Sequence, residues 1–87
     1  MYVTAIHSIS DPEQFFGGQL DLPDGVALHS VIPNGDGSRA VCIWEADSAG
    51  TVERIVESAA GEISDNEYFE VDTSKAQGLP APAAQEA

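Results

Sequence analysis

Residues 26–46 read VALHSVIPNGDGSRAVCIWEA, and this stretch decides the fold. Two runs of mostly apolar residues, many of them β-branched, flank a segment of Pro, Asn, Gly, Asp and Ser, which are the residue types of tight turns. We therefore predict two antiparallel strands, residues 26–32 and 39–46, joined by a turn over residues 33–38.

The hairpin also predicts which side chains share a face of the sheet. A symmetric loop centred between Gly35 and Asp36 pairs Cys42 with His29, although a single bulge would shift this register. Because side chains alternate across a strand, the hairpin has two different faces. One is aliphatic and is expected to pack beneath helices, and the other contains polar and aromatic residues that are less typical of a hydrophobic core. The aliphatic set is Leu28, Ile32, Val41 and Ile43, and the second set is His29, Val31, Cys42 and Trp44.

The residues before the hairpin predict a strand and a short helix. Residues 2–9 contain β-branched and aromatic residues in partial alternation, which is typical of a strand. Residues 10–13, SDPE, combine capping residues, a first-turn proline and the Glu of a capping box, so a helix is expected to begin here. The glycine pair at 17–18 and the Pro-Asp-Gly at 23–25 keep that helix short.

The residues after the hairpin predict a second helix and a fourth strand. Ser48 is suited to cap a helix that Gly61 ends. Residues 67–72 resume a two-residue alternation of apolar and polar side chains, which indicates a strand. The expected apolar stripe of the helix is Val52, Ile55, Val56 and Ala59.

This order of elements is that of the α+β, ferredoxin-like βαββαβ fold, a four-stranded antiparallel sheet with two helices on one face. The helix-free face would be bare in a single chain. We therefore expect a homodimer of the dimeric α+β barrel kind, in which two sheets enclose a core or a ligand pocket. Residues 1–72 are predicted as the domain, and residues 73–87, rich in Ala, Pro and Gln, as a mobile or partner-docking tail.

The composition restricts the partners of the protein. Fifteen acidic residues against three basic ones give a net charge of −12, which repels nucleic acid and anionic membrane surfaces. No segment approaches the roughly 18 consecutive apolar residues of a spanning helix. The single cysteine, Cys42, has no partner for an intramolecular disulfide, which favours a reducing compartment, so we predict a cytoplasmic protein. From the charge and the lack of a long apolar segment, we predict no nucleic-acid or membrane partners.

The predicted face with His29, Cys42 and Trp44 supplies the candidate pocket. His29 is the candidate acid or base, and its predicted neighbour Cys42 would be the nucleophile of a Cys–His pair. A cysteine in an apolar strand is more often an inert small hydrophobe, so Cys42 is expected to line the pocket. Trp44 is interpreted as a core or dimer-face anchor, with a stacking platform as the alternative.

A metal site is a second interpretation of the same region. His7 and His29 are the two histidines, and Glu45 is a nearby strand-end carboxylate, so together they could bind nickel, zinc or a similar divalent ion. This site requires His7 and His29 on the same face. The alternative for each histidine is a structural or a titrating surface role.

Residues 41–49, VCIWEADSA, together with Val52 in the following helix, resemble the C-L-x-E-A-P-(D/S)-A-x-x-V stretch of a family of small ferredoxin-like proteins. Some members of that family are known as nickel-binding. His7 and residues 66–71, NEYFEV, are also similar, so the likeness covers about residues 2–72. Asp47 stands where proline is usual in the family. The resemblance implies a dimeric α+β barrel with His7 and Glu45 as metal ligands.

These observations support three hypotheses of function. The first is a non-catalytic, homodimeric binding protein that holds a divalent metal or a small ligand at the helix-free sheet face. The second is a small cofactor-free enzyme of the monooxygenase, isomerase or cyclase type, with Trp44 lining its pocket and His29 as acid or base. The third is an accessory subunit whose tail docks on a partner.

Overall fold

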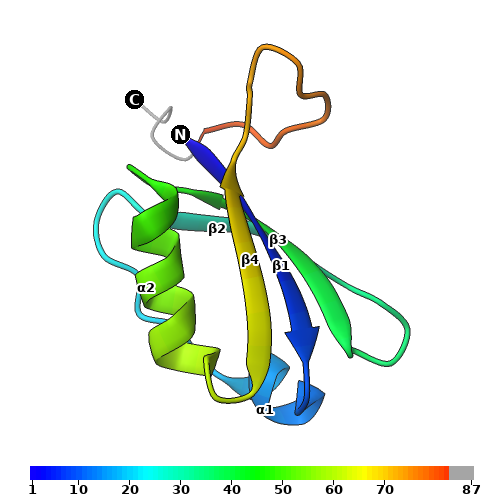
Figure 1. The fold of residues 1–87 in the computed structure, drawn as a ribbon. Helices are drawn as coiled ribbons and strands as arrows, with labels where there is room; N and C mark the ends of the chain where they lie inside the picture. The colour runs from blue at the N-terminus through cyan, green and yellow to red at the C-terminus, as the bar shows by residue number, and fades with distance from the viewer. Residues whose placement is uncertain (83–87) are drawn as a thin grey trace.

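Four strands and two helices form an antiparallel sheet that carries both helices on one face (Figure 1). The computed structural model of the protein describes residues 1–82. The strand order is β2-β3-β1-β4, and every neighbouring pair is antiparallel, as predicted for a ferredoxin-like fold. The elements are β1 (Tyr2–Ile9), α1 (Pro12–Gly17), β2 (Ala27–Pro33), β3 (Arg39–Glu45), α2 (Ala49–Ala60) and β4 (Ser64–Glu70).

Both helices begin at predicted capping residues, but the capping box expected from Ser10 and Glu13 is wrong, because Asp11 is the N-cap of α1 and the Ser10 hydroxyl donates to the Ile63 carbonyl. Asp11 accepts a hydrogen bond from the backbone N–H of Gln14 at 3.1 Å, and Pro12 occupies the first turn of α1. The Ser48 hydroxyl oxygen accepts from the backbone N–H of Thr51 at 3.1 Å at the start of α2. Each cap satisfies a backbone donor that a helix leaves unpaired at its N-terminus, which explains why local sequence fixes these boundaries.

The turn between β2 and β3 is built from the residues that predict it. Asp36 accepts hydrogen bonds from the backbone N–H of Ser38 at 3.0 Å and from its hydroxyl at 2.6 Å. Asn34 accepts from the backbone N–H of Arg39 at 3.1 Å. Gly37 has a φ of 76°, a left-handed conformation that glycine adopts without steric cost.

The predicted register of the hairpin is wrong, because β2 contains a bulge. Cys42 pairs with Val31 and not with His29, and the register shifts between Leu28 and Ser30. The extra residue is His29, so Leu28 lies opposite Trp44. Compared with the prediction, Leu28 and His29 have therefore exchanged faces.

The face that lies beneath the helices is also the reverse of the prediction. Trp44 is 1% exposed and is the largest fully buried side chain, whereas Ile32 on the other face of the hairpin remains 57% exposed. Burying the larger aromatic surface is more favourable, since the hydrophobic contribution grows by about 25 cal/mol per Å². The buried cluster consists of Val3, Ala5, Cys42, Trp44, Ala46, Val52 and Val56.

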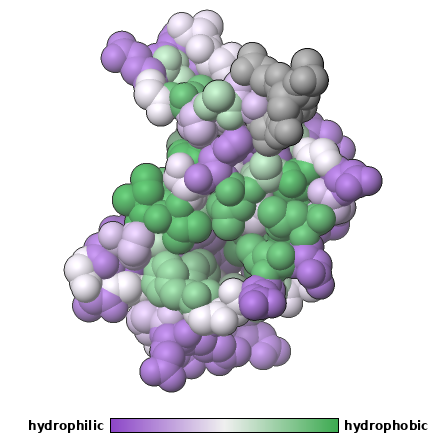
Figure 2. All heavy atoms as spheres, turned by 180° about the vertical axis from the view of Figure 1, so that it is seen from behind, coloured by the Kyte–Doolittle hydropathy of each residue, from purple (hydrophilic) through white to green (hydrophobic). Residues whose placement is uncertain are grey.

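Several large apolar side chains stay exposed outside this core. Seen from behind, apolar surface forms a band across the middle of the molecule, between hydrophilic ends (Figure 2). The large apolar residues with more than a third of their surface exposed are Met1, Phe16, Leu20, Leu22, Val31, Ile32 and Phe69. No helix within residues 1–82 has the length and apolar character needed to cross a membrane.

The chain after β4 turns back toward the first strand. The backbone N–H of Val71 donates to the Tyr2 carbonyl at 2.9 Å, and the Tyr2 hydroxyl donates to the Pro80 carbonyl at 2.5 Å. Residues 73–82 of the predicted tail thus have a contact with the domain. Residues 83–87 of that tail lie outside the described residues.

Candidate functional site

A cavity of about 200 Å³ lies between the helix-bearing face of the sheet and the two helices. His7 of β1, Cys42 and Trp44 of β3, Phe15 of α1 and Val56 of α2 are among its walls. An apolar cavity of about 150 Å³ is large enough to bind benzene, so this space is suited to one aromatic ring.

The cavity brings together part of the predicted pocket. Cys42 and Trp44 both line it, but it lies beneath the helices and not on the helix-free face for which their pocket was predicted. His29 is not among its walls. The bulge in β2 is the reason, because it places Leu28 at the position that a regular strand would give to His29.

Residue His7 is almost fully buried, with 1% of its surface exposed, and is held by a hydrogen bond from a neighbouring strand. Its Nδ1 lies 2.5 Å from the Oδ1 atom of Asn66, the residue directly paired with it in β4. The Asn66 amide nitrogen donates to Glu57 of α2 at 2.8 Å. Since a carboxylate only accepts, the Asn66 oxygen must face His7, and the imidazole proton lies on Nδ1.

Glu57 anchors this arrangement from the surface of α2. The Tyr68 hydroxyl donates to the same Glu57 oxygen at 2.7 Å. The hydrogen bonds from Asn66 and then Tyr68, with the nearby His7, lower the pKa of Glu57 below its ordinary value. Burial and the bond to Glu57 raise the pKa of Tyr68.

Sequence reasoning missed Asn66, Glu57 and Tyr68 as site residues. Glu57 lies outside the apolar stripe predicted for its helix and is exposed, and its position in that pattern gives no sign of its bonds to β4. The one available signal was the two-residue spacing of Asn66 and Tyr68, which puts both side chains on one face of the last strand.

The indole of Trp44 carries an unpaired donor. Its Nε1 atom is buried and has no hydrogen-bond partner within residues 1–82. A buried donor without a partner costs about 1–3 kcal/mol relative to one that is hydrogen-bonded. Trp44 lines the cavity, and its buried N–H is unsatisfied.

The thiol of Cys42 is unsuited to nucleophilic chemistry near neutral pH. Cys42 is a free cysteine with 4% of its surface exposed. Burial raises the pKa of its thiol to about 11, so the thiol stays protonated. The predicted Cys42–His29 pair does not form, because His29 contacts Glu45 instead.

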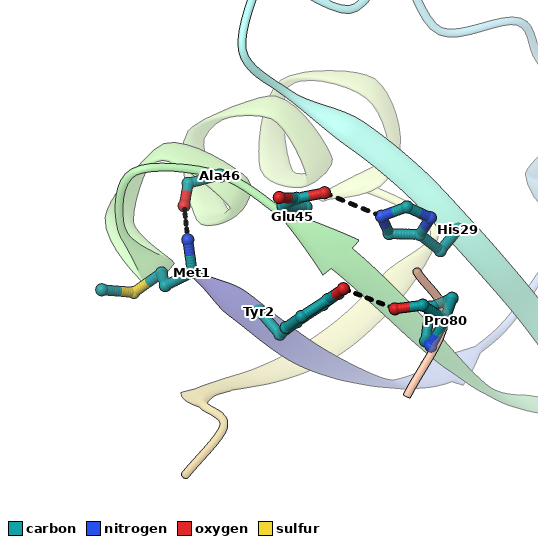
Figure 3. A network of polar contacts seen from close by, with 6 residues as sticks. All are labelled: Met1, Tyr2, His29, Glu45, Ala46 and Pro80. Carbon is teal, nitrogen blue, oxygen red and sulfur yellow. Dashed lines mark hydrogen bonds and ion pairs between the residues drawn. The ribbon is translucent and has the colours of Figure 1, made fainter. Parts of the chain in front are cut away.

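His29 forms a polar pair at one end of the helix-free face (Figure 3). Its Nε2 lies 3.0 Å from the Oε1 atom of Glu45, and its ring centre lies 5.8 Å from that of Tyr2. Tyr2 also bonds the tail through Pro80. His29 and Glu45, two of the predicted metal ligands, are therefore neighbours.

The third predicted metal ligand, His7, lies apart from that pair. His7 packs against Phe15 of α1, with ring centres 5.1 Å apart, beneath the helices. His29 and Glu45 lie on the opposite side of the sheet. Within residues 1–82, no group of three or more His, Cys, Asp or Glu side chains converges in a way that could hold a metal ion.

A second hollow, of about 480 Å³, lies between α2 and the segment that follows α1. Its lining mixes polar residues, among them Asp21 and Arg54, with apolar ones such as Leu20 and Ile55, and it contains none of the predicted site residues. We therefore consider the smaller cavity, which is lined by the buried His7 together with Cys42 and Trp44, to be the candidate functional site.

Comparisons of the chain with protein-family models, with curated proteins and with solved structures gave no match. The family suggested by residues 41–49 thus stays a prediction. The cavity remains the main structural feature that bears on function, and its walls are mainly apolar.

Proposed function

We propose that this protein binds a small aromatic ligand in the cavity between its sheet and its helices. The observation that carries the proposal is a mainly apolar cavity of about 200 Å³ whose walls include the rings of His7, Phe15 and Trp44. This function agrees with the first hypothesis drawn from the sequence, a non-catalytic binding protein, but its site lies on the helix-bearing face of the sheet and not on the helix-free face.

The size of the cavity limits the affinity that we expect. A single ring of six to eight non-hydrogen atoms, at about 0.7 kcal/mol per atom, gains about 5 kcal/mol, which corresponds to a Kd of roughly 0.2 mM. A larger natural ligand would extend outward past Val31, which lines the cavity and is 44% exposed.

Titration with toluene, followed by NMR and by the fluorescence of the single tryptophan, tests this function. Val31→Phe narrows the cavity from β2 and is expected to weaken binding at least tenfold. Ile32→Phe is the matched control, because Ile32 is the next residue of the same strand, is also exposed and faces the opposite side. If the wild type leaves Trp44 and the other wall residues unperturbed at millimolar toluene, the proposal fails.

We also propose that two copies of the chain associate through their helix-free faces. Ile32 and Phe69, on the outer strands, are 57% and 50% exposed there. Contiguous exposed apolar surface on a sheet favours association. Two cross-strand rows supply the apolar residues of this face. One is Ile32, Val41 and Ile6, which ends at Glu67, and the other is Ser30, Ile43, Thr4 and Phe69.

Sedimentation equilibrium tests the association. Ile32→Asp is expected to shift the protein toward the single-chain mass, because it places a charge at the most exposed apolar residue of this face. Leu22→Asp, at an exposed apolar residue outside the sheet, should leave the mass unchanged. A wild-type protein that remains a single chain at a concentration of about 0.1 mM would contradict this proposal.

A further inference from the structure

His7, with 1% of its surface exposed, lines the cavity, and its Nε2 atom is the ring nitrogen that Asn66 does not bind. The Nδ1 atom is bound to Asn66 in β4, and the two ring nitrogens of an imidazole point in divergent directions. Nε2 therefore points away from β4. His7 lines the cavity, and no group within residues 1–82 forms a hydrogen bond with its Nε2.

Residues behind His7 fix this nitrogen in its accepting form. The Glu57 carboxylate accepts from the Asn66 amide, which turns the Asn66 oxygen toward Nδ1. The proton of the neutral imidazole then stays on Nδ1, and the lone pair stays on Nε2. Asn66 and Glu57 act through His7, so they are positioning residues.

The walls around Nε2 offer little to satisfy it. Phe15, Leu28 and Val31 are apolar. The lining residues that carry N–H donors, Gln14, Gln19 and Trp44, form no hydrogen bond with Nε2. Buried polar atoms in proteins are nearly always hydrogen-bonded. A donor for Nε2 has to be brought by the molecule that occupies the cavity.

Building on the proposed function, we infer that the ligand is a phenol or a similar aromatic ring with one hydrogen-bond donor, and that this donor binds Nε2 of His7. The ring packs among the apolar walls, and its hydroxyl group reaches the histidine. An aromatic hydrocarbon fits the same space but leaves Nε2 unpaired, so it binds more weakly.

Competing phenol and toluene titrations test this inference, at a pH where His7 is neutral by NMR. We expect phenol to bind the wild type about fivefold to tenfold more tightly than toluene. His7→Phe keeps a ring and removes the acceptor, so it should abolish that preference while toluene still binds. His29→Phe, the same change on the opposite face of the sheet, should retain the preference.

Equal affinities of the wild type for phenol and toluene would overturn the inference and leave the proposed function standing. A phenol preference that survives His7→Phe would also overturn it. If neither compound binds the wild type, both proposals fail.

A second measurement covers the case in which the His7 variant does not fold. In long-range ¹⁵N spectra of the wild type, His7 should be the Nδ1–H tautomer, and its Nε2 resonance should move on addition of phenol and not of toluene. An Nε2–H tautomer, or an Nε2 resonance that phenol leaves unchanged, would contradict the inference.

Discussion

His7 and His29 lie on opposite faces of one sheet. His7 packs against Phe15 beneath the helices, and His29 pairs with Glu45 on the helix-free face. This separation determines what the two histidines can do. One is a buried group with a fixed hydrogen-bond partner, and the other belongs to a polar pair near the surface.

The first prediction concerns the expected nickel or zinc site. His29 and Glu45 supply two neighbouring ligands, whereas firm binding of these ions usually requires three or four protein ligands. We expect calorimetric titration with Ni²⁺ or Zn²⁺ to show a Kd weaker than about 0.1 mM, and His29→Ala to remove the heat. Stoichiometric binding at micromolar metal would show that ligands from a second chain complete the site.

Cys42 should resist alkylation in the folded protein. Burial raises the pKa of its thiol from 9.0 to about 11, which lowers the thiolate fraction about a hundredfold near pH 8. The rate of reaction with iodoacetamide, followed by mass spectrometry, should rise about tenfold for each pH unit up to about pH 10. The protein unfolded in guanidinium serves as the control and should level off near pH 9. A plateau below pH 10 in the folded protein would contradict the assigned burial.

Acid should destabilise the protein partly through Glu57. Its pKa is lowered from 4.5, mainly by the hydrogen bonds from Asn66 and Tyr68. A lowered folded-state pKa stabilises the protein at pH values above 4.5, and that contribution is lost as the pH falls through the folded-state value. Urea unfolding of Glu57→Gln should therefore show a smaller loss of unfolding free energy between about pH 5 and pH 3.

Glu53→Gln is the control for this measurement. It removes one charge from the same exposed surface of α2 and leaves the bonds of Glu57 to β4 intact. The wild-type pH dependence should persist in this variant. An identical pH dependence in Glu57→Gln and the wild type would show that these bonds do not contribute.

Gly37 should be required in the hairpin turn. Its φ is 76°, and an added Cβ would lie 3.0 Å from the Cβ of Pro12. We expect Gly37→Ala to lower the free energy of unfolding by about 1–2 kcal/mol. Gly35→Ala, in the same turn but with open space and no positive φ, should change it by less than about 0.5 kcal/mol. Equal effects of the two substitutions would exclude backbone strain as the cause.

The elements of the fold were predictable because their signals are local. Asp11 and Ser48 cap their helices through backbone groups three residues away, and the turn residues bond within a few positions of each other. The bulge at His29 was not predictable, since neither a glycine nor a proline marks it. That one residue exchanged Leu28 and His29 between the faces of the sheet.

The site was less predictable than the fold because its contacts are distant in sequence. His7 and Asn66 are 59 residues apart, and they meet only after β1 and β4 have paired. The choice of the helix-bearing face depended on the size of Trp44, which is a property of packing and not of alternation. A pattern of alternating residues separates two faces but does not say which one the helices cover.

The hydrogen bond from the Tyr2 hydroxyl to the Pro80 carbonyl makes the C-terminal residues competitors of a second copy for the helix-free face. It places the chain over one end of the surface that we propose for association, next to His29 and Glu45. A second copy that binds this surface must either accommodate the C-terminal residues held there or displace them. The same protein shortened to end before residue 73 would then dimerise more readily, and its monomer–dimer equilibrium would no longer depend on the Tyr2 hydroxyl.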